Sequence, residues 1–345
     1  MKIAAIAHRI PSRQVDNAEL VRLVLDRNAG RYDEAGLSRL GERLQEYFLR
    51  TGVRSRFWRG EGEKAVTLGL EAGAKALQEA GVRPEDVDLL LYVGVGRGWI
   101  EPAMANLFLA ELGLSKATGF DVVDACASWL RALDIAAGFI QTGRARKVLI
   151  LNCECNVEEH CDFVVPDMQS LEYLLPGCTI GEAVTATLIT DETPQAEYRA
   201  LFRTWGAYHG LCRIPLPNQD QYRLRTEDGR HEAHKFYAYG TRLIRVTMRK
   251  LVDTYRADPY FRALRPDICF GHFVSEAVTT EGERLLGLRP GLTYRSGSRY
   301  GNTVSASLPL AMSLAVQDGS LRRGQTVLFL VGSAGISVGL GALTF

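Results

Sequence analysis

Three residues of types that take part in covalent catalysis each follow a short run with the pattern of a β-strand. They are Cys126, His272 and Asn302. A thiolate is a nucleophile, an imidazole exchanges a proton near neutral pH, and an amide N–H₂ group can donate to a developing oxyanion. Together these three groups suit acyl transfer through a thioester.

Cys126 precedes a stretch with apolar residues at helical spacing that ends near Gly143. A thiol in the first turn of a helix lies near the positive end of the helix dipole and near free backbone N–H groups, which favours the thiolate. Each residue also has a purely structural interpretation. A cysteine between alanines is often core, a histidine after a strand is often structural, and an asparagine after glycine is often a turn residue.

The pattern of elements occurs twice along the chain. Strand-like and helix-like runs alternate, which predicts an α/β fold, and the order helix, strand, helix, strand, helix, strand of residues 65–152 recurs in 241–332. The sequence separation of Cys126 and Gly143 equals that of Asn302 and Gly319. We therefore predict that Cys126 and Asn302 occupy equivalent strand-to-helix turns.

This repeat predicts two similar α/β halves that arose by internal duplication, 1–190 and 191–345. Ligands of open α/β sheets bind beyond the carboxyl ends of the strands. An approximate twofold relation between the halves would bring Cys126, His272 and Asn302, all at strand ends, to one place.

Composition excludes several classes of partner. The chain has 345 residues and is 46% hydrophobic, enough for a large core. With 41 basic and 40 acidic residues it has no basic field, which argues against nucleic acid and anionic membranes as partners. The first apolar run stops at Arg9, and no apolar stretch is long enough to span a membrane, so we expect a cytoplasmic protein.

Cysteine and histidine spacings do not predict a metal site. The seven cysteines should be reduced thiols in such a protein. Cys153, Cys155, His160 and Cys161 form the tightest cluster, but C-x-C is not the usual zinc spacing, and a buried strand that runs out into a loop is the better interpretation. The segment 231–234 lacks the H-E-x-x-H pattern.

Four motifs, in order, carry a resemblance to a known family over nearly the whole chain. They are "RTGVRSR" (50–56), "DACASWLRALDIAAGFIQTGRARKVLIL" (124–151), "GH" (271–272) and "YGNTVSASLPLAM" (300–312). The chain resembles the thiolase-fold ketosynthases, most closely β-ketoacyl-acyl-carrier-protein synthase III. The resemblance implies a thiolase-like fold, with two similar halves packed in a layered α/β/α/β/α arrangement.

The resemblance also implies an acyltransferase mechanism. Cys126 would accept the acyl group, and His272 and Asn302 would polarise the thioester carbonyl of a malonyl-type extender and stabilise the enolate left by decarboxylation. The enolate would attack the acyl group and give a β-ketoacyl product. Backbone N–H groups of Cys126 and of the loop at Ser333 and Ala334 would form the other oxyanion hole. No metal or bound cofactor is implied, the substrates and partners are acyl-CoA or acyl-carrier-protein thioesters, and the protein is expected to be a homodimer.

Several positions depart from the family pattern. Its H-Q-A-N motif reads "HFVS" here, so that Ser275 replaces the second Asn, and Ala334 stands where Gly is usual. Trp129 replaces a common Phe, and Glu101 replaces an apolar residue that reaches the partner's acyl pocket. We expect these two residues, Ser275 and Arg50 to contribute to substrate binding.

Two further stretches differ from the family. An aromatic residue that stacks on the CoA adenine is expected before the "RTG" motif, but Glu46 stands there, beside Tyr47. The segment 191–235 is unlike the family, and its aromatic and arginine residues either shape a pocket or form a surface insertion.

Three functions compete on this sequence. The first is a decarboxylating ketosynthase III-like enzyme of a specialised pathway, such as polyketide or quinolone assembly. The second is an acyltransferase of the same fold that moves an acyl group from Cys126 to a hydroxyl, amine or carrier thiol without forming a C–C bond. The third is a non-catalytic subunit, which the complete set of Cys126, His272 and Asn302 disfavours.

Overall fold

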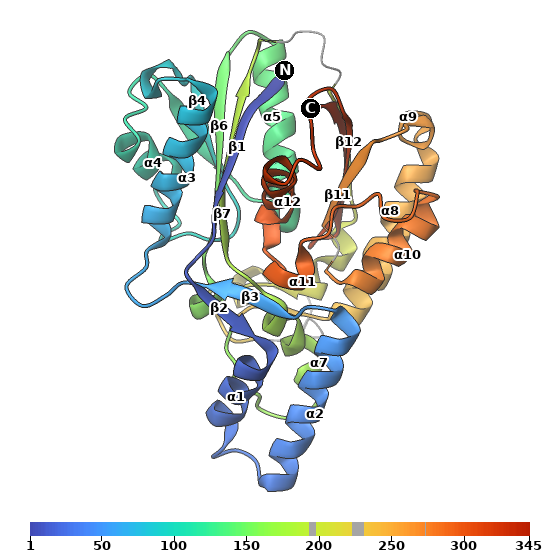
Figure 1. Ribbon diagram of the computed structural model, residues 1–345. Coiled ribbons are helices and arrows are strands. Elements are labelled where there is room, and N and C mark those ends of the chain that lie inside the picture. Colours follow the sequence, from blue (N-terminus) through green and yellow to red (C-terminus); the bar gives the residue numbers. More distant parts are fainter. Residues whose placement is uncertain (193–197, 223–230, 273) are drawn as a thin grey trace.

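Two large β-sheets and three layers of helices build the body of the protein, and two two-stranded sheets, β2–β3 and β9–β10, are added to it. The computed structural model describes residues 1–192, 198–222, 231–272 and 274–345. In Figure 1 the layers follow one another from left to right, with helices on the outside and between the sheets. This is the layered α/β arrangement that the sequence predicts.

The first sheet has the strand order β1-β7-β6-β4-β5. Its strands are β1 (Lys2–Arg9), β4 (Leu89–Val93), β5 (Thr118–Val122), β6 (Lys147–Glu154) and β7 (Ala183–Thr190). β7 runs antiparallel to β1 and β6, whereas β6, β4 and β5 are parallel. β4 and β7 are buried along their whole length, which explains their continuous apolar or β-branched sequences.

The second sheet repeats this pattern of directions. Its order is β11-β12-β13-β8, with β8 (Tyr198–Thr204), β11 (Ile268–His272), β12 (Thr326–Ser333) and β13 (Ser337–Thr344). β13 is antiparallel to β8 and β12, and β11 is parallel to β12. A single parallel bridge from Cys269 to Thr293 takes the place that β5 has in the first sheet. The repeat of the sequence pattern favours a weak strand at 292–296, and the structure has only this bridge there.

Two helices lie between the sheets, and others cover the outer faces. α5 (Ser128–Gln141) and α12 (Ser307–Gln317) share one buried cluster with both sheets. α3 (Ala65–Ala80) and α4 (Ala105–Glu111) pack on the outer face of the first sheet, and α8 (Gly240–Ala257) and α10 (Glu276–Leu286) cover the second. α12 buries apolar residues on every side because both of its faces meet a sheet.

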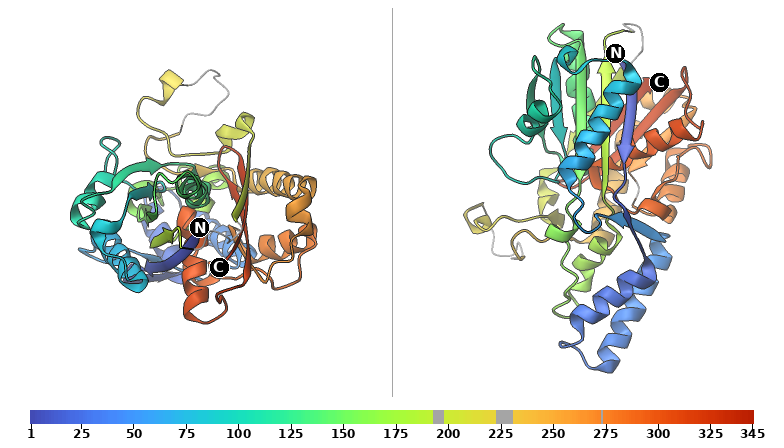
Figure 2. Two further views of the ribbon diagram at one scale, coloured as in Figure 1. Left: turned by 90° about the horizontal axis from the view of Figure 1, so that it is seen from above. Right: turned by 60° about the vertical axis from the view of Figure 1, so that its left-hand side comes forward.

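Most of the remaining elements lie at the end of the layers where the predicted site residues gather. α1 (Asn17–Asn28) and α2 (Glu34–Thr51) form a hairpin that projects from the body, as the right-hand view of Figure 2 shows. Short elements complete this end and the edges. They are β2 (Arg13–Asp16), β3 (Ser55–Trp58), α6 (Val157–His160), α7 (Leu171–Leu174), β9 (Cys212–Arg213), β10 (Tyr237–Ala238), α9 (Pro259–Ala263) and α11 (Gly297–Tyr300).

The predicted equivalence of Cys126 and Asn302 is wrong by one helical turn. The two central helices are each preceded by a 3₁₀ turn, η2 (Ala125–Ala127) and η6 (Val304–Ala306). Each turn begins with a non-glycine residue of positive φ, 45° at Ala125 and 50° at Val304. The equivalent of Cys126 is therefore Ser305. Counting back from the terminal glycines fails because α5 has 14 residues and α12 has 11.

Candidate active site

One cavity of about 340 Å³ brings the predicted catalytic residues together. Cys126, His272 and Asn302 line it, and so do Ser333 and Ala334 of the turn after β12. They come from both halves of the chain. The three residues thus meet at one site although Cys126 and Asn302 are not equivalent in the repeat.

The surroundings of Cys126 favour the neutral thiol. Burial raises the pKa of this thiol, and the nearby Cys212 and Glu154 raise it further. Desolvation thus acts against the thiolate that the position before a helix favours.

His272 is the last residue of β11 and is buried. Burial lowers the pKa of its imidazole from 6.5 to about 4. At neutral pH the ring is therefore uncharged, with one N–H donor and one acceptor nitrogen. A neutral imidazole can donate to a thioester oxygen without bringing a charge into the cavity.

This buried histidine predicts a pH-dependent stability. Between about pH 6.5 and 4 the unfolded chain binds a proton at His272 while the folded protein does not, so the free energy of unfolding falls as pH falls. We expect this residue to contribute a loss on the order of 1–3 kcal/mol over that window. Denaturant titrations from pH 7 to pH 4 on wild type and His272→Asn measure it. His8, whose pKa is also lowered to about 4, is present in both proteins and cancels. Parallel pH profiles for the two proteins would contradict the prediction.

Asn302 is clamped by backbone contacts. Its N–H donates to the Thr179 carbonyl at 2.8 Å, and its carbonyl accepts from the Gly181 N–H at 3.0 Å. A Cβ on Gly181 would lie 2.0 Å from the Tyr300 carbonyl oxygen, so this close approach requires glycine. The side-chain Oδ1 accepts from the Val304 N–H at 3.0 Å, which leaves the amide N–H₂ as the group able to donate to a ligand.

The turn after β12 is tied to the Cys126 turn by a serine. Ser333 Oγ donates to the Asp124 carbonyl at 2.9 Å and accepts from the Ala127 N–H at 3.3 Å. The two backbone segments predicted to form the oxyanion hole are therefore fixed relative to one another. Ala334 lines the cavity next to this contact.

Two of the residues predicted to bind substrate lie outside the cavity wall. Trp129 is 1% exposed, packs edge-on against Phe329, and donates from Nε1 to Thr187 Oγ1 at 3.0 Å. The structure assigns it to packing rather than substrate contact, because it faces the sheet. Arg50 is exposed near the end of α2, with its guanidinium 5.4 Å from the Tyr47 ring. It is Tyr47, not Arg50, that lines the cavity.

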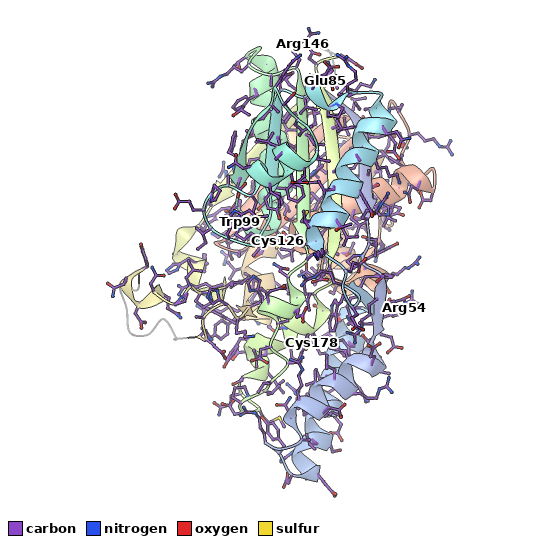
Figure 3. The ribbon with its side chains drawn as sticks, turned by 90° about the vertical axis from the view of Figure 1, so that its left-hand side faces the viewer. Arg54, Glu85, Trp99, Cys126, Arg146 and Cys178 are labelled. Atoms are coloured by element: carbon purple, nitrogen blue, oxygen red, sulfur yellow. The ribbon has the colours of Figure 1, made fainter. Side chains whose placement is uncertain are left out.

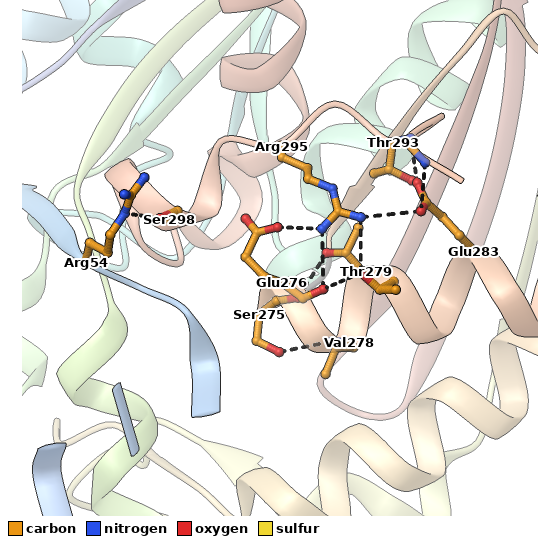
Figure 4. Close-up of polar contacts among 11 residues, drawn as sticks. Arg54, Ser275, Glu276, Val278, Thr279, Glu283, Thr293, Arg295 and Ser298 are labelled. Carbon is orange, nitrogen blue, oxygen red and sulfur yellow. Dashed lines mark hydrogen bonds and ion pairs between the residues drawn. The ribbon is translucent and has the colours of Figure 1, made fainter. Parts of the chain in front are cut away.

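Ser275 and Glu101 do not line this cavity either. Ser275 caps α10, where its hydroxyl accepts from the Val278 N–H at 3.1 Å beside the Arg295–Glu276 ion pair (Figure 4). Ser275 lines a smaller neighbouring cavity together with His272 and Asn302. Glu101 is exposed in the loop after β4. Phe273, the second residue of the "HFVS" stretch, lies outside the described residues.

The sequence did not reveal most of the cavity wall. One face of α8 supplies Leu243, Ile244, Thr247, Met248 and Leu251, and the β9–β10 ribbon supplies Cys212 and Ala238. An apolar helix face has the same pattern whether it meets a core or an empty cavity, so no signal separates the two. The ribbon lies in the segment 191–235 and just beyond it, where a pocket-forming role is an open alternative. Residues 193–197 and 223–230 of the chain lie outside the described part.

A buried polar network under the Cys126 turn also went unpredicted. The Glu154 carboxylate accepts from the Ser305 hydroxyl and from the N–H groups of Val95, at 3.2 Å, and Gly96, at 3.1 Å. It joins the end of β6 to η6 of the other half. Ser305, the equivalent of Cys126, is therefore a structural residue here.

Within residues 1–192, 198–222, 231–272 and 274–345, no group of three or more His, Cys, Asp or Glu is placed to hold a metal ion. Cys153, Cys155 and Cys161 are buried thiols, and Cys153 lies in β6 as predicted. No helix in the described part of the chain has the length and apolar character needed to cross a bilayer.

Family models match two parts of the chain. Residues 120–198 match 3-oxoacyl-[acyl-carrier-protein (ACP)] synthase III, and residues 267–345 match the C-terminal model of the same synthase. These two stretches hold Cys126, His272 and Asn302. This chain is a ketosynthase III-like enzyme of the thiolase fold. Its class is that of an acyltransferase that belongs with the Claisen-condensing enzymes.

Similar proteins agree with this assignment. The ketosynthase III-like chain is 27% identical to the β-ketoacyl-[acyl-carrier-protein] synthase III of Methylococcus capsulatus over 86% of this chain and 88% of that one. It is 25% identical to the synthase III of Rhizorhabdus wittichii over 97% and 96% of the two chains.

Solved structures share the whole fold. OleA of Xanthomonas campestris, solved with bound lauric acid and lauroyl-CoA, matches with a TM-score of 0.83 at 20% identity and covers 99% of this chain and 98% of its own. The priming β-ketosynthase of the R1128 polyketide pathway matches with a TM-score of 0.80 at 25% identity, covering 100% and 96%.

Proposed function

We propose that this ketosynthase III-like enzyme loads an acyl group on Cys126 and condenses it, with loss of CO₂, with a malonyl-type thioester. The observation that carries the proposal is one cavity lined by a thiol that follows β5, a neutral imidazole at the end of β11 and an oriented amide from the turn after α11. Cys126 serves as nucleophile, and His272 and Asn302 serve as donors to the extender carbonyl.

The proposed steps balance without a metal or redox partner. In the first half-reaction the Cys126 sulfur bonds to the acyl carbon, the donor thioester bond breaks, and the thiol proton ends on the departing thiol. In the second, the C–CO₂ bond of the extender breaks and its electron pair forms an enolate under His272 and Asn302. The enolate carbon attacks the Cys126 thioester, and the thiolate that leaves regains a proton.

The cavity favours an acyl chain as the group that is transferred. Its wall along α8 and the β9–β10 ribbon is largely apolar, which suits a hydrocarbon chain through burial of apolar surface. Neighbours that prime a polyketide pathway or bind lauroyl-CoA support a role in a specialised pathway. We propose such a pathway, with polyketide or quinolone assembly as the type.

The proposal is tested by measuring CO₂ release and product mass together. Wild-type enzyme is acylated with an acyl-CoA panel, then mixed with ¹⁴C-carboxyl-labelled malonyl-CoA or malonyl-carrier protein. Labelled CO₂ and a β-ketoacyl product formed in equal amounts are the expected result. Acyl transfer with no CO₂ from either malonyl donor would overturn it.

A second candidate is acyl transfer without C–C bond formation. The position of Ser275 favours it, because this residue caps α10 and leaves the cavity without the second amide of the family motif. In that case Cys126 would pass its acyl group to a hydroxyl, amine or carrier thiol. An acylated product with no loss of CO₂ would identify this activity.

We also propose that two copies associate along β5. This edge strand pairs only with β4 among the described strands, and Val123, Ile100 and Trp99 beside it are 59%, 69% and 40% exposed. Figure 3 shows this face, with Trp99 and Cys126 labelled. An unpaired edge next to exposed apolar side chains favours pairing with a second copy. A monomer in analytical ultracentrifugation at micromolar concentration would refute the dimer.

A further inference from the structure

A second cavity of about 320 Å³ lies against the β9–β10 ribbon, whose residues also line the reaction cavity. The ribbon pairs Cys212 with Ala238, and both line the reaction cavity. Their chain neighbours Leu211, Tyr237 and Tyr239 line the second cavity, called here the tyrosine–arginine recess. Alternation along a strand explains the division, because successive side chains point to opposite faces.

Arg213 joins the two cavities. It ends β9 and lines both the reaction cavity and the recess. Its guanidinium reaches His209, whose carbonyl accepts from Nε at 3.2 Å. A ligand that passes from one cavity to the other would pass this cation.

The recess combines cations with aromatic rings. Arg213 and Arg242 supply the charge, and no Asp or Glu among the residues that the structure describes lines the recess. The aromatic members are Tyr208, His209, His231, Tyr237 and Tyr239. Burial, together with the charge of Arg213, lowers the pKa of His231, which therefore presents an uncharged ring at neutral pH.

The rings are held in place by one another. His231 stacks on Tyr237 with centroids 3.4 Å apart, and Tyr173 and Tyr239 approach Tyr237 edge-on at 6.4 and 6.2 Å. A rigid aromatic wall beside two guanidinium groups recognises a flat ring that carries anionic substituents, through stacking, cation–π contact and bidentate hydrogen bonds.

We infer that the tyrosine–arginine recess binds the nucleotide end of the CoA thioester that donates the acyl group to Cys126. The inference rests on the proposed function and deepens it. CoA carries a planar adenine and phosphate groups at one end and the thioester at the other, which matches a recess and a reaction cavity that share Arg213. The phosphopantetheine arm of a carrier protein has no adenine and would leave the recess unused.

The position at which the family pattern places an adenine-stacking aromatic residue does not offer such a site in this chain. Glu46 stands at the position before the "RTG" motif and pairs with Arg43 on the exposed side of α2. A carboxylate there repels phosphate. The recess instead combines two arginines with aromatic rings, and no carboxylate of the described residues lines it.

Arg242→Ala is the test variant, because Arg242 is exposed on α8 and lines the recess without lining the reaction cavity. Arg249→Ala is the matched control, since Arg249 is an exposed arginine on the same helix that lines neither cavity. Loading of Cys126 is followed by intact-protein mass with two donors, an acyl-CoA and the same acyl group on pantetheine.

We expect wild type to load from the CoA ester at least about tenfold more efficiently than from the pantetheine ester. Arg242→Ala should lose about tenfold in kcat/KM with the CoA ester and keep its rate with the pantetheine ester, and Arg249→Ala should match wild type. Equal use of both donors by wild type, or equal losses with both donors in Arg242→Ala, would overturn the inference.

Direct binding separates this inference from the proposed function. Adenosine 3′,5′-bisphosphate is titrated calorimetrically into Cys126→Ala, which cannot be acylated at residue 126. We expect binding that weakens about tenfold on adding Arg242→Ala and weakens with salt. If the bisphosphate does not bind, the inference that the recess binds the nucleotide end of CoA is wrong, whatever the loading assay shows. If the bisphosphate binds but no donor loads an acyl group on the wild-type enzyme, the proposed function is wrong and the inference that the recess binds the nucleotide stands.

Discussion

Cys126→Ala is expected to abolish acyl loading while Cys212→Ala retains it. Both cysteines line the reaction cavity, and burial raises the pKa of both thiols, to about 12 at Cys212. Only Cys126 lies in the turn that Ser333 ties to the neighbouring loop. We expect the rate of loading to fall by at least about 10³-fold in Cys126→Ala, because no other group in the cavity can form the thioester at that position.

The comparison of the two cysteines makes this experiment sharp. Each protein is mixed with the acyl-CoA panel, and the intact mass is recorded with time. One acyl adduct on wild type and on Cys212→Ala, absent from Cys126→Ala, is the expected pattern. An adduct that persists on Cys126→Ala and disappears from Cys212→Ala would move the nucleophile to β9.

His272→Ala and Asn302→Ala should each slow decarboxylation of the malonyl thioester by about 10²–10³-fold, the range for removing one oxyanion donor. Loading of Cys126 should fall less, within about tenfold, because the loading step relies on backbone donors near Ala334. The larger effect on decarboxylation follows from the geometry at Asn302. Its Oδ1 accepts from the Val304 N–H, which leaves its N–H₂ group to donate to the carbonyl of the malonyl thioester.

Ser275→Ala is the control for this pair. It removes the cap of α10 and should cost about 1 kcal/mol of stability, yet leave CO₂ release nearly unchanged. Release of ¹⁴CO₂ and Cys126 acylation are measured on the same preparations. If His272→Ala and Asn302→Ala lower both rates equally, the two residues act in loading or in folding, and their proposed role in decarboxylation is wrong.

Much of the fold could be predicted because it is encoded locally. The apolar periodicity of α3 and α5 and the continuous apolar run of β4 predict these elements, and their repetition in the second half predicts the two-sheet architecture. The carboxyl-end rule for α/β sheets then places Cys126 and His272 close together without any knowledge of contacts. The family resemblance rests on the same residues.

Features that depend on packing between the two halves of the chain could be seen only in the tertiary structure. The true partner of Cys126 is Ser305, since the two central helices differ in length and only their N-terminal turns superpose in conformation. Trp129 packs against Phe329 and Thr187 of the sheets and does not line the cavity, because of contacts between segments that are distant in the sequence. The side of a helix that meets a cavity cannot be told from the side that meets core, because both are apolar in sequence.

The sequence by itself determined the residue types at the site, the order of the elements and the family of the chain. Only the tertiary structure decided the charge state of Cys126 and His272 and the existence of the tyrosine–arginine recess. The physical reason is that desolvation and ring stacking depend on neighbours brought together from distant segments. A local pattern such as a cysteine before a helix predicts a thiolate, but burial in the assembled cavity reverses the preference.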